Sequence, residues 1–334
     1  MSNRSHAYLL PHLIEQAADA SPDADALRFR DGALTYSELY GRACALANGL
    51  LEDGMQPGDR VGILLRKGLE SAVALYGVML AGGVYVPLDP FAPAARIEFV
   101  LRDCGIQRLV AGEQTIGTLL TLAETGLELQ TVFGVPDEGV LPYRVVPWST
   151  VEPLARTAPV IATTEQDLCY ILYTSGSTGS PKGIMHTHRS ALSWAEVAAS
   201  AYELGPNDVV SNYAPLHFDL STLDYFAGAR AGATTTIIPE EVTRFPASLA
   251  AFLADERLTV FYTVPMALIH LAQPELLAGR DLDRLRLVLF GGEPMPIKHL
   301  RRIMQIIPTA RFVNVYGPTE TNGDTHYPVE AVPS

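Results

Sequence analysis

The segment that most constrains this chain is a continuous apolar run, Leu168–Tyr173, which leads directly into a loop rich in glycine and hydroxyl residues. An uninterrupted apolar run of this length is typical of a strand buried on both faces, as in a parallel sheet covered by helices. The loop reads TSGSTGSPKG over 174–183. Its glycines, Gly176, Gly179 and Gly183, permit backbone conformations in which successive N–H groups point toward one anion. The segment therefore predicts a phosphate-binding loop after a buried strand.

The side chains of this loop also favour phosphate. Lys182 adds a mobile positive charge, and four hydroxyl groups add hydrogen-bond donors. These hydroxyl residues are Thr174, Ser175, Ser177 and Thr178. In a Walker loop, Gly-Lys-Ser/Thr opens a helix, whereas here Pro181 precedes the lysine and Gly183 follows it. Because proline keeps the preceding Ser180 out of the helical region, the chain should stay extended as it approaches the lysine.

The rest of the chain alternates apolar runs of strand length with segments of helical length. Strands are expected near 26–30, 60–65, 84–86, 108–111, 168–173, 209–213, 235–238, 260–263, 287–290 and 312–316. Helices are expected near 9–20, 34–54, 68–81, 93–104 and from about 190. This alternation predicts an α/β fold with doubly wound, parallel sheets. Five prolines between Gly134 and Pro159 indicate a surface crossing between two halves.

The composition argues against several classes of function. The 334 residues are 48% hydrophobic and 18% charged, as in an ordinary globular protein. A net charge of −13 argues against non-specific binding to nucleic acid and against docking on an anionic membrane. No apolar stretch reaches the ~20 residues of a membrane span, and three separated cysteines without zinc spacing indicate buried thiols in a reducing cytoplasm. His186 and His188 form an HxH pair without an evident third metal ligand, so both are expected to support the loop.

Four ordered segments resemble the core motifs of the adenylate-forming superfamily, which includes acyl-CoA synthetases, luciferases and the adenylation domains of non-ribosomal peptide synthesis. TSGSTGSPKG is similar to the phosphate-loop signature of that superfamily. LTYSEL at 34–39 resembles the first core motif of adenylation domains, and LAGGVYVPLD at 80–89 resembles the second, with alanine where lysine is usual. NVYGPTE at 314–320 resembles the adenine and magnesium motif. The resemblance covers nearly the whole chain and implies the fold of an adenylation-domain N-terminal core.

The resemblance also implies a nucleotide site for ATP and Mg²⁺. Tyr316 would pack on the adenine, Asn314 would bond its edge, and Glu320 would hold the metal together with phosphate oxygens. The other expected adenine-site residues are Gly291, Gly292, Glu293, Val315 and Gly317. Bare glycine backbone after the apolar run 287–290 leaves room for a flat ring at a strand end.

The implied reaction is attack of a substrate carboxylate on the α-phosphorus of ATP, with release of pyrophosphate. The carboxylate is already ionised, so catalysis consists mainly of positioning and charge stabilisation. The residues expected to act in it are Lys182, Thr319 and Glu320. Lys182 would hold the β- and γ-phosphates, and Thr319 would contact the α-phosphate.

The substrate class depends on Asp219, a single carboxylate within the apolar stretch HFDLS. A buried aspartate needs a partner, although the residue is also suited to capping the next helix. In amino-acid-activating members of the superfamily the matching aspartate pairs with the substrate ammonium, whereas aryl-acid activators have asparagine, so Asp219 favours an amino acid. The other pocket positions carried across are Phe218, Leu220, Leu223, Thr263, Leu289, Gly291, Val315, Gly323 and Asp324. Most are aliphatic or small, which suits a modest apolar side chain.

Two features of the substrate stay open at this point. Asp324 would hold a second amino group if it faced the pocket, since a buried carboxylate needs a cationic or hydrogen-bonding partner. The alternative is that it turns to solvent or bonds His326. The stretch FDLSTLDYF resembles enzymes that load small α- or β-amino acids onto carrier proteins, and sequence does not separate α from β.

The resemblance suggests a domain organisation and a limit on activity. Residues 1–334 are expected to form the N-terminal core, with one subdomain of about 55–200 and another of about 1–54 plus 201–334. The first would carry the phosphate loop, and the second the substrate pocket and adenine site. Family members continue with a TGD motif and a small C-terminal domain that supplies a catalytic lysine and meets the phosphopantetheine carrier protein. A chain ending at Ser334 is therefore expected to bind its ligands but to catalyse slowly, since losing one preorganised charge costs about 10²–10³ in rate.

Two other functions compete with amino-acid adenylation. An acyl- or aryl-CoA ligase core predicts that amino acids fail as substrates and that Asp219→Asn has little effect. A non-catalytic binding module predicts no detectable ATP binding.

Overall fold

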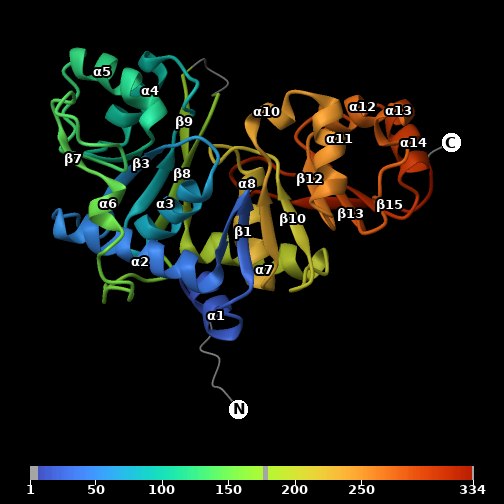
Figure 1. Ribbon diagram of the computed structural model, residues 1–334, viewed down its shortest axis with the longest axis horizontal. Coiled ribbons are helices and arrows are strands. Elements are labelled where there is room, and N and C mark those ends of the chain that lie inside the picture. Colours follow the sequence, from blue (N-terminus) through green and yellow to red (C-terminus); the bar gives the residue numbers. More distant parts are fainter. Residues whose placement is uncertain (1–6, 176–179, 333–334) are drawn as a thin grey trace. The chain divides into compact units, whose positions relative to one another are not determined.

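The computed structural model describes residues 7–175 and 180–332, and the chain divides into two compact units (Figure 1). Unit 1 contains Met1–Asp23 and Leu34–Ser193, and unit 2 contains Ala24–Ala33 and Trp194–Ser334. Each unit has its own sheet of mainly parallel strands. The mixed α/β class and the two parallel-rich sheets are as the sequence predicts.

The N-terminal segment is divided differently from the expected subdomains. α2 (Tyr36–Glu52) belongs to unit 1 because it packs against α3 (Leu69–Leu80). The two helices approach so closely that a Cβ on Gly77 would lie 2.9 Å from a methyl group of Leu46. Of the first 54 residues, 24–33 alone belong to unit 2, where β1 pairs with β11. The second boundary falls inside α7 rather than near residue 200.

The sheet of unit 1 has the strand order β7-β6-β5-β3-β4-β8-β9. Its strands are β3 (Arg60–Leu64), β4 (Val84–Pro87), β5 (Arg108–Ala111), β6 (Thr131–Phe133), β7 (Arg144–Val146), β8 (Leu168–Thr174) and β9 (Lys182–Thr187). Its helices are α1 (His12–Ala20), α2, α3, α4 (Ala94–Asp103), the short η1 (Glu113–Thr115), α5 (Ile116–Glu124) and α6 (Trp148–Val151), and α7 (His188–Ala201) begins here. Neighbouring strands are parallel except for β8 and β9, which are antiparallel.

The sequence-based expectation for unit 1 misses several short elements. The proline-rich segment 134–159 is not simply a crossing, because it contributes β7 to the sheet edge and the short helix α6. α5, β6 and β9 were also not expected. By contrast, α2 begins where LTYSEL predicts, because Thr35 and Glu38 form a reciprocal capping box. The Glu38 amide donates to the Thr35 hydroxyl at 3.2 Å, and the Thr35 amide donates to the Glu38 carboxylate at 2.9 Å.

The sheet of unit 2 has the strand order β15-β14-β13-β12-β10-β11-β1-β2. Its strands are β1 (Asp25–Phe29), β2 (Gly32–Thr35), β10 (Val209–Asn212), β11 (Thr234–Ile237), β12 (Val260–Thr263), β13 (Leu287–Gly291), β14 (Arg311–Tyr316) and β15 (Thr325–Val329). Its helical elements are α8 (Leu220–Thr222), the π-helical turn η2 (Leu223–Ala227), α9 (Gly228–Ala231), α10 (Glu240–Thr243), α11 (Pro246–Asp255), α12 (Pro265–Leu271), α13 (Pro274–Leu277) and α14 (Ile297–Ile306). β10 to β14 are joined by parallel pairing, and β15 is an antiparallel edge strand.

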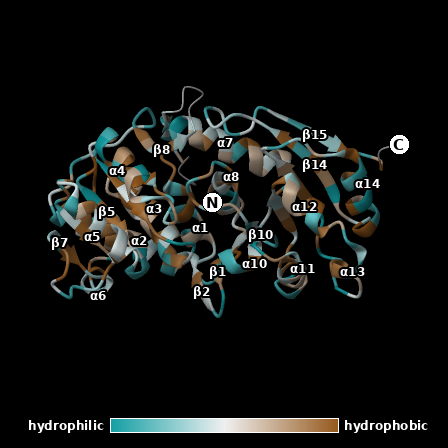
Figure 2. Cartoon of the chain, turned by 90° about the horizontal axis from the view of Figure 1, so that it is seen from above, coloured by the Kyte–Doolittle hydropathy of each residue, from teal (hydrophilic) through white to brown (hydrophobic). Residues whose placement is uncertain are grey.

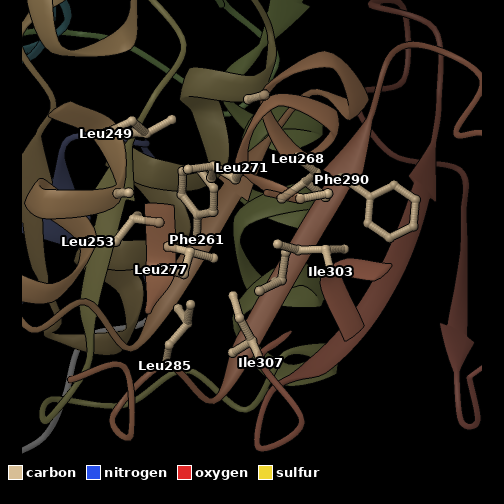
Figure 3. Close-up of a cluster of buried hydrophobic side chains, with 14 of the residues drawn as sticks. Leu249, Leu253, Phe261, Leu268, Leu271, Leu277, Leu285, Phe290, Ile303 and Ile307 are labelled. Atoms are coloured by element: carbon tan, nitrogen blue, oxygen red, sulfur yellow. The ribbon is translucent and has the colours of Figure 1, made fainter. Parts of the chain in front are cut away.

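Alternate residues of the unit 2 strands belong to two hydrophobic clusters on opposite faces of the sheet. This follows from the two-residue period of a strand. The α7 cluster consists of Ala198, Tyr202, Val210, Leu223, Ala227, Ala233, Val260, Tyr262, Leu287, Leu289, Val313 and Val315. The α14 cluster includes Leu249, Leu253, Phe261, Leu268, Leu271, Leu277, Leu285, Val288, Phe290, Ile303, Ile307 and Phe312, most of them labelled in Figure 3.

Helices such as α14 cover the α14 cluster with the apolar side of an amphipathic helix. α14, IKHLRRIMQI, carries both hydrophobic and hydrophilic residues (Figure 2) and buries Leu300, Ile303 and Met304 against the strands. These positions recur at three- and four-residue spacing, so they form one stripe of the helix. Each face of the sheet is therefore covered by a separate set of buried side chains.

Two expectations from composition can be compared with the structure. Cys44, Cys104 and Cys169 are buried and free of disulfides, as expected of small apolar side chains. Across residues 7–175 and 180–332, no helix combines the length and apolar character that a membrane crossing requires.

Candidate active site

The predicted phosphate loop lies at the end of the β8–β9 hairpin in unit 1. Thr174 pairs with Lys182, and Tyr173 pairs with Gly183, across the antiparallel strands. Lys182 is exposed and begins a strand, so the chain is extended where it reaches the lysine, as Pro181 predicts. Ser175 is also exposed. Gly176, Ser177, Thr178 and Gly179 lie outside the described residues.

Close packing shapes the base of this hairpin. A Cβ on Gly183 would lie 2.9 Å from a methyl carbon of Ile171 and 3.1 Å from the ring of Tyr173, so a larger residue would push the strands apart. The Tyr173 hydroxyl donates to the Asp103 carboxylate at 2.5 Å and lies 3.2 Å from the Cys104 sulfur. Burial and the bond to Asp103 both raise the pKa of Tyr173, so it is a neutral donor. The hairpin base is thus closely packed, whereas the exposed Lys182 lies toward its tip.

The two histidines of the HxH pair, His186 in β9 and His188 at the start of α7, are both buried. The His186 ring stacks on Tyr170, with centroids 4.7 Å apart. His188 is fully buried, and its Nδ1 accepts a hydrogen bond from the Leu10 amide at 3.1 Å. Burial lowers the pKa of His188 to about 4. Both imidazoles fit the predicted supporting role, and the described residues hold no cluster of three or more metal-ligating side chains.

Unit 2 brings several predicted substrate residues together on one face of its sheet. Leu223, Leu289 and Val315 are buried members of the α7 cluster, and the half-buried Leu220 packs against it. They come from η2, β13, β14 and α8, which lie far apart in sequence. The pairing of Gly291 with Val315 sets the register that places them side by side.

The structure does not place Thr263 on this face. Tyr262 pairs with Leu289, whereas Thr263 pairs with Phe290, and paired residues of parallel strands point to the same side of the sheet. Tyr262 accordingly belongs to the α7 cluster and Phe290 to the α14 cluster. Tyr262 therefore shares a face with Leu289, and Thr263 does not, whereas the pocket role of Thr263 stays a prediction.

Asp219 lies beside this face at the start of α8. It is half-buried and occupies the N-cap position, but its side chain makes no capping hydrogen bond, so capping does not explain the carboxylate. Burial raises the pKa of Tyr262, and the negative charges of Asp219 and Asp224 raise it further. Phe218, by contrast, is 54% exposed and packs against the ring of His217 at 4.7 Å.

Two of the expected adenine residues, Asn314 and Tyr316, lie on the other side of β14 from Val315, which belongs to the α7 cluster. Asn314 and Tyr316 are exposed and alternate with the buried Val315, and the Tyr316 side chain is 68% exposed. Gly291 has no room for a side chain, because an added Cβ would collide with the Val315 carbonyl. Gly292 has φ +88° and open space around it, so bare backbone is exposed at the end of β13, and Glu293 after it is exposed.

The segment between β14 and β15 is tightly folded. A Cβ on Gly317 would collide with the Asn322 carbonyl, and a Cβ on Gly323 would lie 2.5 Å from the Trp194 ring. Thr319 is half-buried and Glu320 is exposed. The Asp324 amide donates to the Tyr316 carbonyl at 2.9 Å, and its side chain is exposed.

The structure describes no hydrogen bond between the side chains of Asp324 and His326, and the His326 ring lies 5.8 Å from that of Tyr202. The exposed Asp324 carboxylate agrees with a side chain that turns to solvent, and whether it faces a bound substrate stays a prediction.

A profile described as AMP-binding enzyme matches residues 14–334. The chain belongs to the AMP-binding enzyme family. Among curated proteins, it is 33% identical over 310 residues to an L-proline--[L-prolyl-carrier protein] ligase of Pseudomonas fluorescens, covering 93% of this chain and 59% of that protein. It is 34% identical over 309 residues to a ligase of the same description from Streptomyces coelicolor, covering 89% of this chain and 57% of that protein. The chain thus spans somewhat more than half the length of these relatives.

Solved structures agree with this family membership. The non-ribosomal peptide synthetase FmoA3 in its AMPPNP-bound form matches with a TM-score of 0.84 and 29% identity, over 98% of this chain and 33% of that one. An anthranilate CoA ligase, AuaEII, in complex with anthranoyl-AMP has a TM-score of 0.87 at 21% identity, over 95% of this chain and 60% of that one, which shows the shared fold.

We call the α7-cluster side of β12, β13 and β14, with α8 and η2, the substrate face, because it holds the predicted substrate residues Leu220, Leu223, Leu289 and Val315. The sequence did not point to three further residues that lie on or against this face: Trp194, Thr222 and Tyr262. The two-residue period of VFYT separates Tyr262 from Thr263, but the pairing with Leu289 is needed to choose between them. Trp194 carries no local signal, because Thr222 and Gly323, which it contacts, are distant in the chain. Its contact with Gly323 becomes visible only in the fold.

Proposed function

We propose that this chain is the nucleotide- and amino-acid-binding core of an enzyme that activates an amino acid as its adenylate. In this reaction the amino-acid carboxylate forms a bond to the α-phosphorus of ATP, and the bond to pyrophosphate breaks. The observation that carries the proposal is that the half-buried Asp219 directly precedes Leu220, which packs against the apolar cluster of Leu223 and Leu289. A carboxylate next to an apolar compartment suits an ammonium group attached to a small apolar side chain.

The nucleotide part of the proposal rests on one residue of unit 1 and on a set of residues of unit 2. In unit 1, Lys182 is an exposed cation at the end of a closely packed hairpin. In unit 2, the exposed ring of Tyr316 and the bare backbone of Gly292 offer a flat surface for adenine. The exposed carboxylate of Glu320 suits Mg²⁺, which binds through one or two carboxylates together with substrate phosphates.

The size of the predicted pocket residues and the substrate named for two relatives limit which amino acids the chain would bind. Leucine, valine and tyrosine side chains fill the α7 cluster, which suits a small aliphatic α- or β-amino acid. The two carrier-protein ligases described as acting on L-proline make that amino acid a candidate. They also support a phosphopantetheine carrier protein as the acceptor of the activated amino acid in the whole enzyme. The exposed Asp324 leaves room for a substrate with a second amino group.

A thermal-unfolding screen tests the proposal without depending on turnover. A ligand that binds the folded state alone raises the unfolding temperature. We expect ATP/Mg²⁺ to stabilise the chain, and L-proline, L-alanine, L-valine or β-alanine to add to that stabilisation. Comparing 2,3-diaminopropanoate with alanine, in wild type and Asp324→Asn, tests for a second amino group.

Asp219→Asn is the discriminating variant. It should lose at least tenfold in amino-acid affinity while keeping its response to ATP, because it removes a charge that pairs with the ammonium. If benzoate or butanoate stabilises the chain as well as an amino acid does, and Asp219→Asn has no effect, the acyl- or aryl-CoA ligase reading replaces this proposal. A folded chain with no response to ATP/Mg²⁺ would instead indicate a non-catalytic binding module.

A further inference from the structure

Trp194, on α7, lies against a glycine of the segment between β14 and β15. A Cβ added to Gly323 would lie 2.5 Å from Cζ3 of the indole, closer than real side-chain contacts allow. The six-membered ring therefore rests directly on the Gly323 backbone. The glycine leaves a space that the indole fills from another part of the chain.

The other edge of the indole is held by a hydrogen bond. Its Nε1–H donates to the Thr222 hydroxyl at 3.0 Å, and that hydroxyl donates to the Asp219 carbonyl at 2.6 Å. Thr222 is buried, so this bond is shielded from water. A bulky side chain fixed at both edges has one orientation, and its position is tied to the backbone of Asp219.

The surroundings of the indole are those of the substrate face. Trp194 is half-buried and packs against the α7 cluster, which contains Leu223, Leu289 and Val315. It thus lies between Asp219 and Leu223 on one side and Gly323 on the other. All these residues belong to unit 2, so their arrangement does not depend on the placement of unit 1.

We propose that Trp194 is a specificity-determining residue that forms a wall of the amino-acid side-chain compartment and limits that side chain in size. The inference rests on the proposed amino-acid activation. The indole fills space that Gly323 leaves open, and its bond through Thr222 prevents it from swinging aside. A substrate with a long or aromatic side chain therefore meets a fixed ring, whereas a small side chain does not.

The test is a series of stable aminoacyl-adenylate analogues of graded size. We would measure the affinity of 5′-O-(aminoacylsulfamoyl)adenosines with alanyl, prolyl, valyl, leucyl and phenylalanyl groups by calorimetry. Wild type should bind the small members best. Trp194→Leu should improve leucyl and phenylalanyl binding relative to alanyl by about tenfold or more, because one methylene in a hydrophobic pocket changes discrimination by about 10–200-fold.

A second variant and a matched control keep the outcome interpretable. Trp194→Phe retains an aromatic ring, so it should fold even if Trp194→Leu does not, and should shift the same preference by a smaller factor. Trp148 of unit 1 also packs against a glycine, since a Cβ on Gly134 would lie 3.0 Å from its indole nitrogen. Trp148→Leu, which is the same change made in unit 1, should leave the preference unchanged.

The failure of this inference differs from the failure of the proposed function. If wild type binds none of the analogues, amino-acid activation itself is contradicted. If wild type binds them but a folded Trp194 variant keeps the wild-type order and spacing of affinities, the size-limiting role is overturned. An equal shift in Trp148→Leu also overturns it, because the effect would then not come from the substrate face.

Discussion

The β8–β9 hairpin of unit 1 and the substrate face of unit 2 are built in opposite ways. The predicted phosphate-binding groups of the hairpin come from one continuous segment, and Lys182 is exposed beyond a closely packed base. The substrate face takes single residues from α7, α8, η2, β12, β13 and β14, and most of them are buried in one cluster. A change at the hairpin tip should alter ligand affinity without altering stability. A change on the substrate face should alter both.

The largest expected effect is on nucleotide binding, in Lys182→Ala. Removing a charged donor to phosphate costs about 1.5–3 kcal/mol, which corresponds to a loss of about 10–100-fold in ATP/Mg²⁺ affinity. The unfolding temperature without ligand should stay the same, because the side chain is exposed. Calorimetric titration with ATP/Mg²⁺ measures the first quantity and a thermal scan the second.

Lys298→Ala provides the matched control for this prediction. Lys298 is also exposed, but it lies on α14 of unit 2 and is not part of the hairpin segment. An equal loss of ATP affinity in Lys298→Ala would mean that the overall charge of the chain, rather than the hairpin, governs nucleotide binding.

The second effect concerns the stability of the substrate face, in Gly323→Ala. The added methyl would be forced into the Trp194 ring, and overpacking of this kind costs about 1–3 kcal/mol in the free energy of unfolding. Trp194→Leu should relieve the clash, so the double variant should be more stable than the sum of the single changes predicts. Denaturant unfolding of the four proteins measures this coupling.

Gly205→Ala is the control glycine for this cycle. A Cβ at Gly205 would meet nothing within 4 Å, so the substitution should change the unfolding free energy by less than about 0.5 kcal/mol. Independent, additive effects of Gly323→Ala and Trp194→Leu would contradict the contact on which the comparison depends.

The third expected effect is a change in stability with pH that arises from the buried His188. The folded pKa of His188 is about 4, below its ordinary value of 6.5, because burial disfavours the charged ring. Between these values the unfolded state binds more protons, so stability falls as pH decreases through this window. We expect a loss of about 1–2 kcal/mol between pH 7 and pH 5 from this residue, and the lowered pKa of His12 acts in the same direction.

His188→Asn removes the titrating ring but keeps an acceptor for the Leu10 amide. It should be less stable than wild type at pH 7 and should show a shallower decline toward pH 5 in denaturant unfolding. His270→Asn, at an exposed histidine of α12, should keep the wild-type slope. If the unfolding free energy of His188→Asn changes with pH as steeply as that of wild type, the His188 imidazole is not held neutral in the folded state as the structure implies.

The two regions also differ in how far the sequence predicts them. The alternating pattern predicts the α/β class and most strands to within a residue or two, and the hairpin loop is recognisable because its residues are contiguous. The substrate face depends on register, and a one-residue shift in VFYT places Thr263 where Tyr262 lies. Trp194 meets Gly323 across about 130 residues, so packing alone reveals the pair. The sequence did not predict β7 (Arg144–Val146) or α6, because the prolines around them indicated a loop.

The smallest expected effect decides whether Tyr262 or Thr263 belongs to the substrate face. Tyr262 lies in the α7 cluster beside Leu289, and burial and the charge of Asp219 both raise its pKa, so Tyr262→Phe should weaken amino-acid binding by about two- to tenfold. Thr263→Val, on the opposite face, should leave amino-acid affinity unchanged within twofold. Calorimetry with the amino acid in the presence of ATP/Mg²⁺ measures both. If Thr263→Val weakens binding and Tyr262→Phe does not, the pocket uses the other face of β12, and the division of unit 2 into an adenine side and a substrate side is wrong.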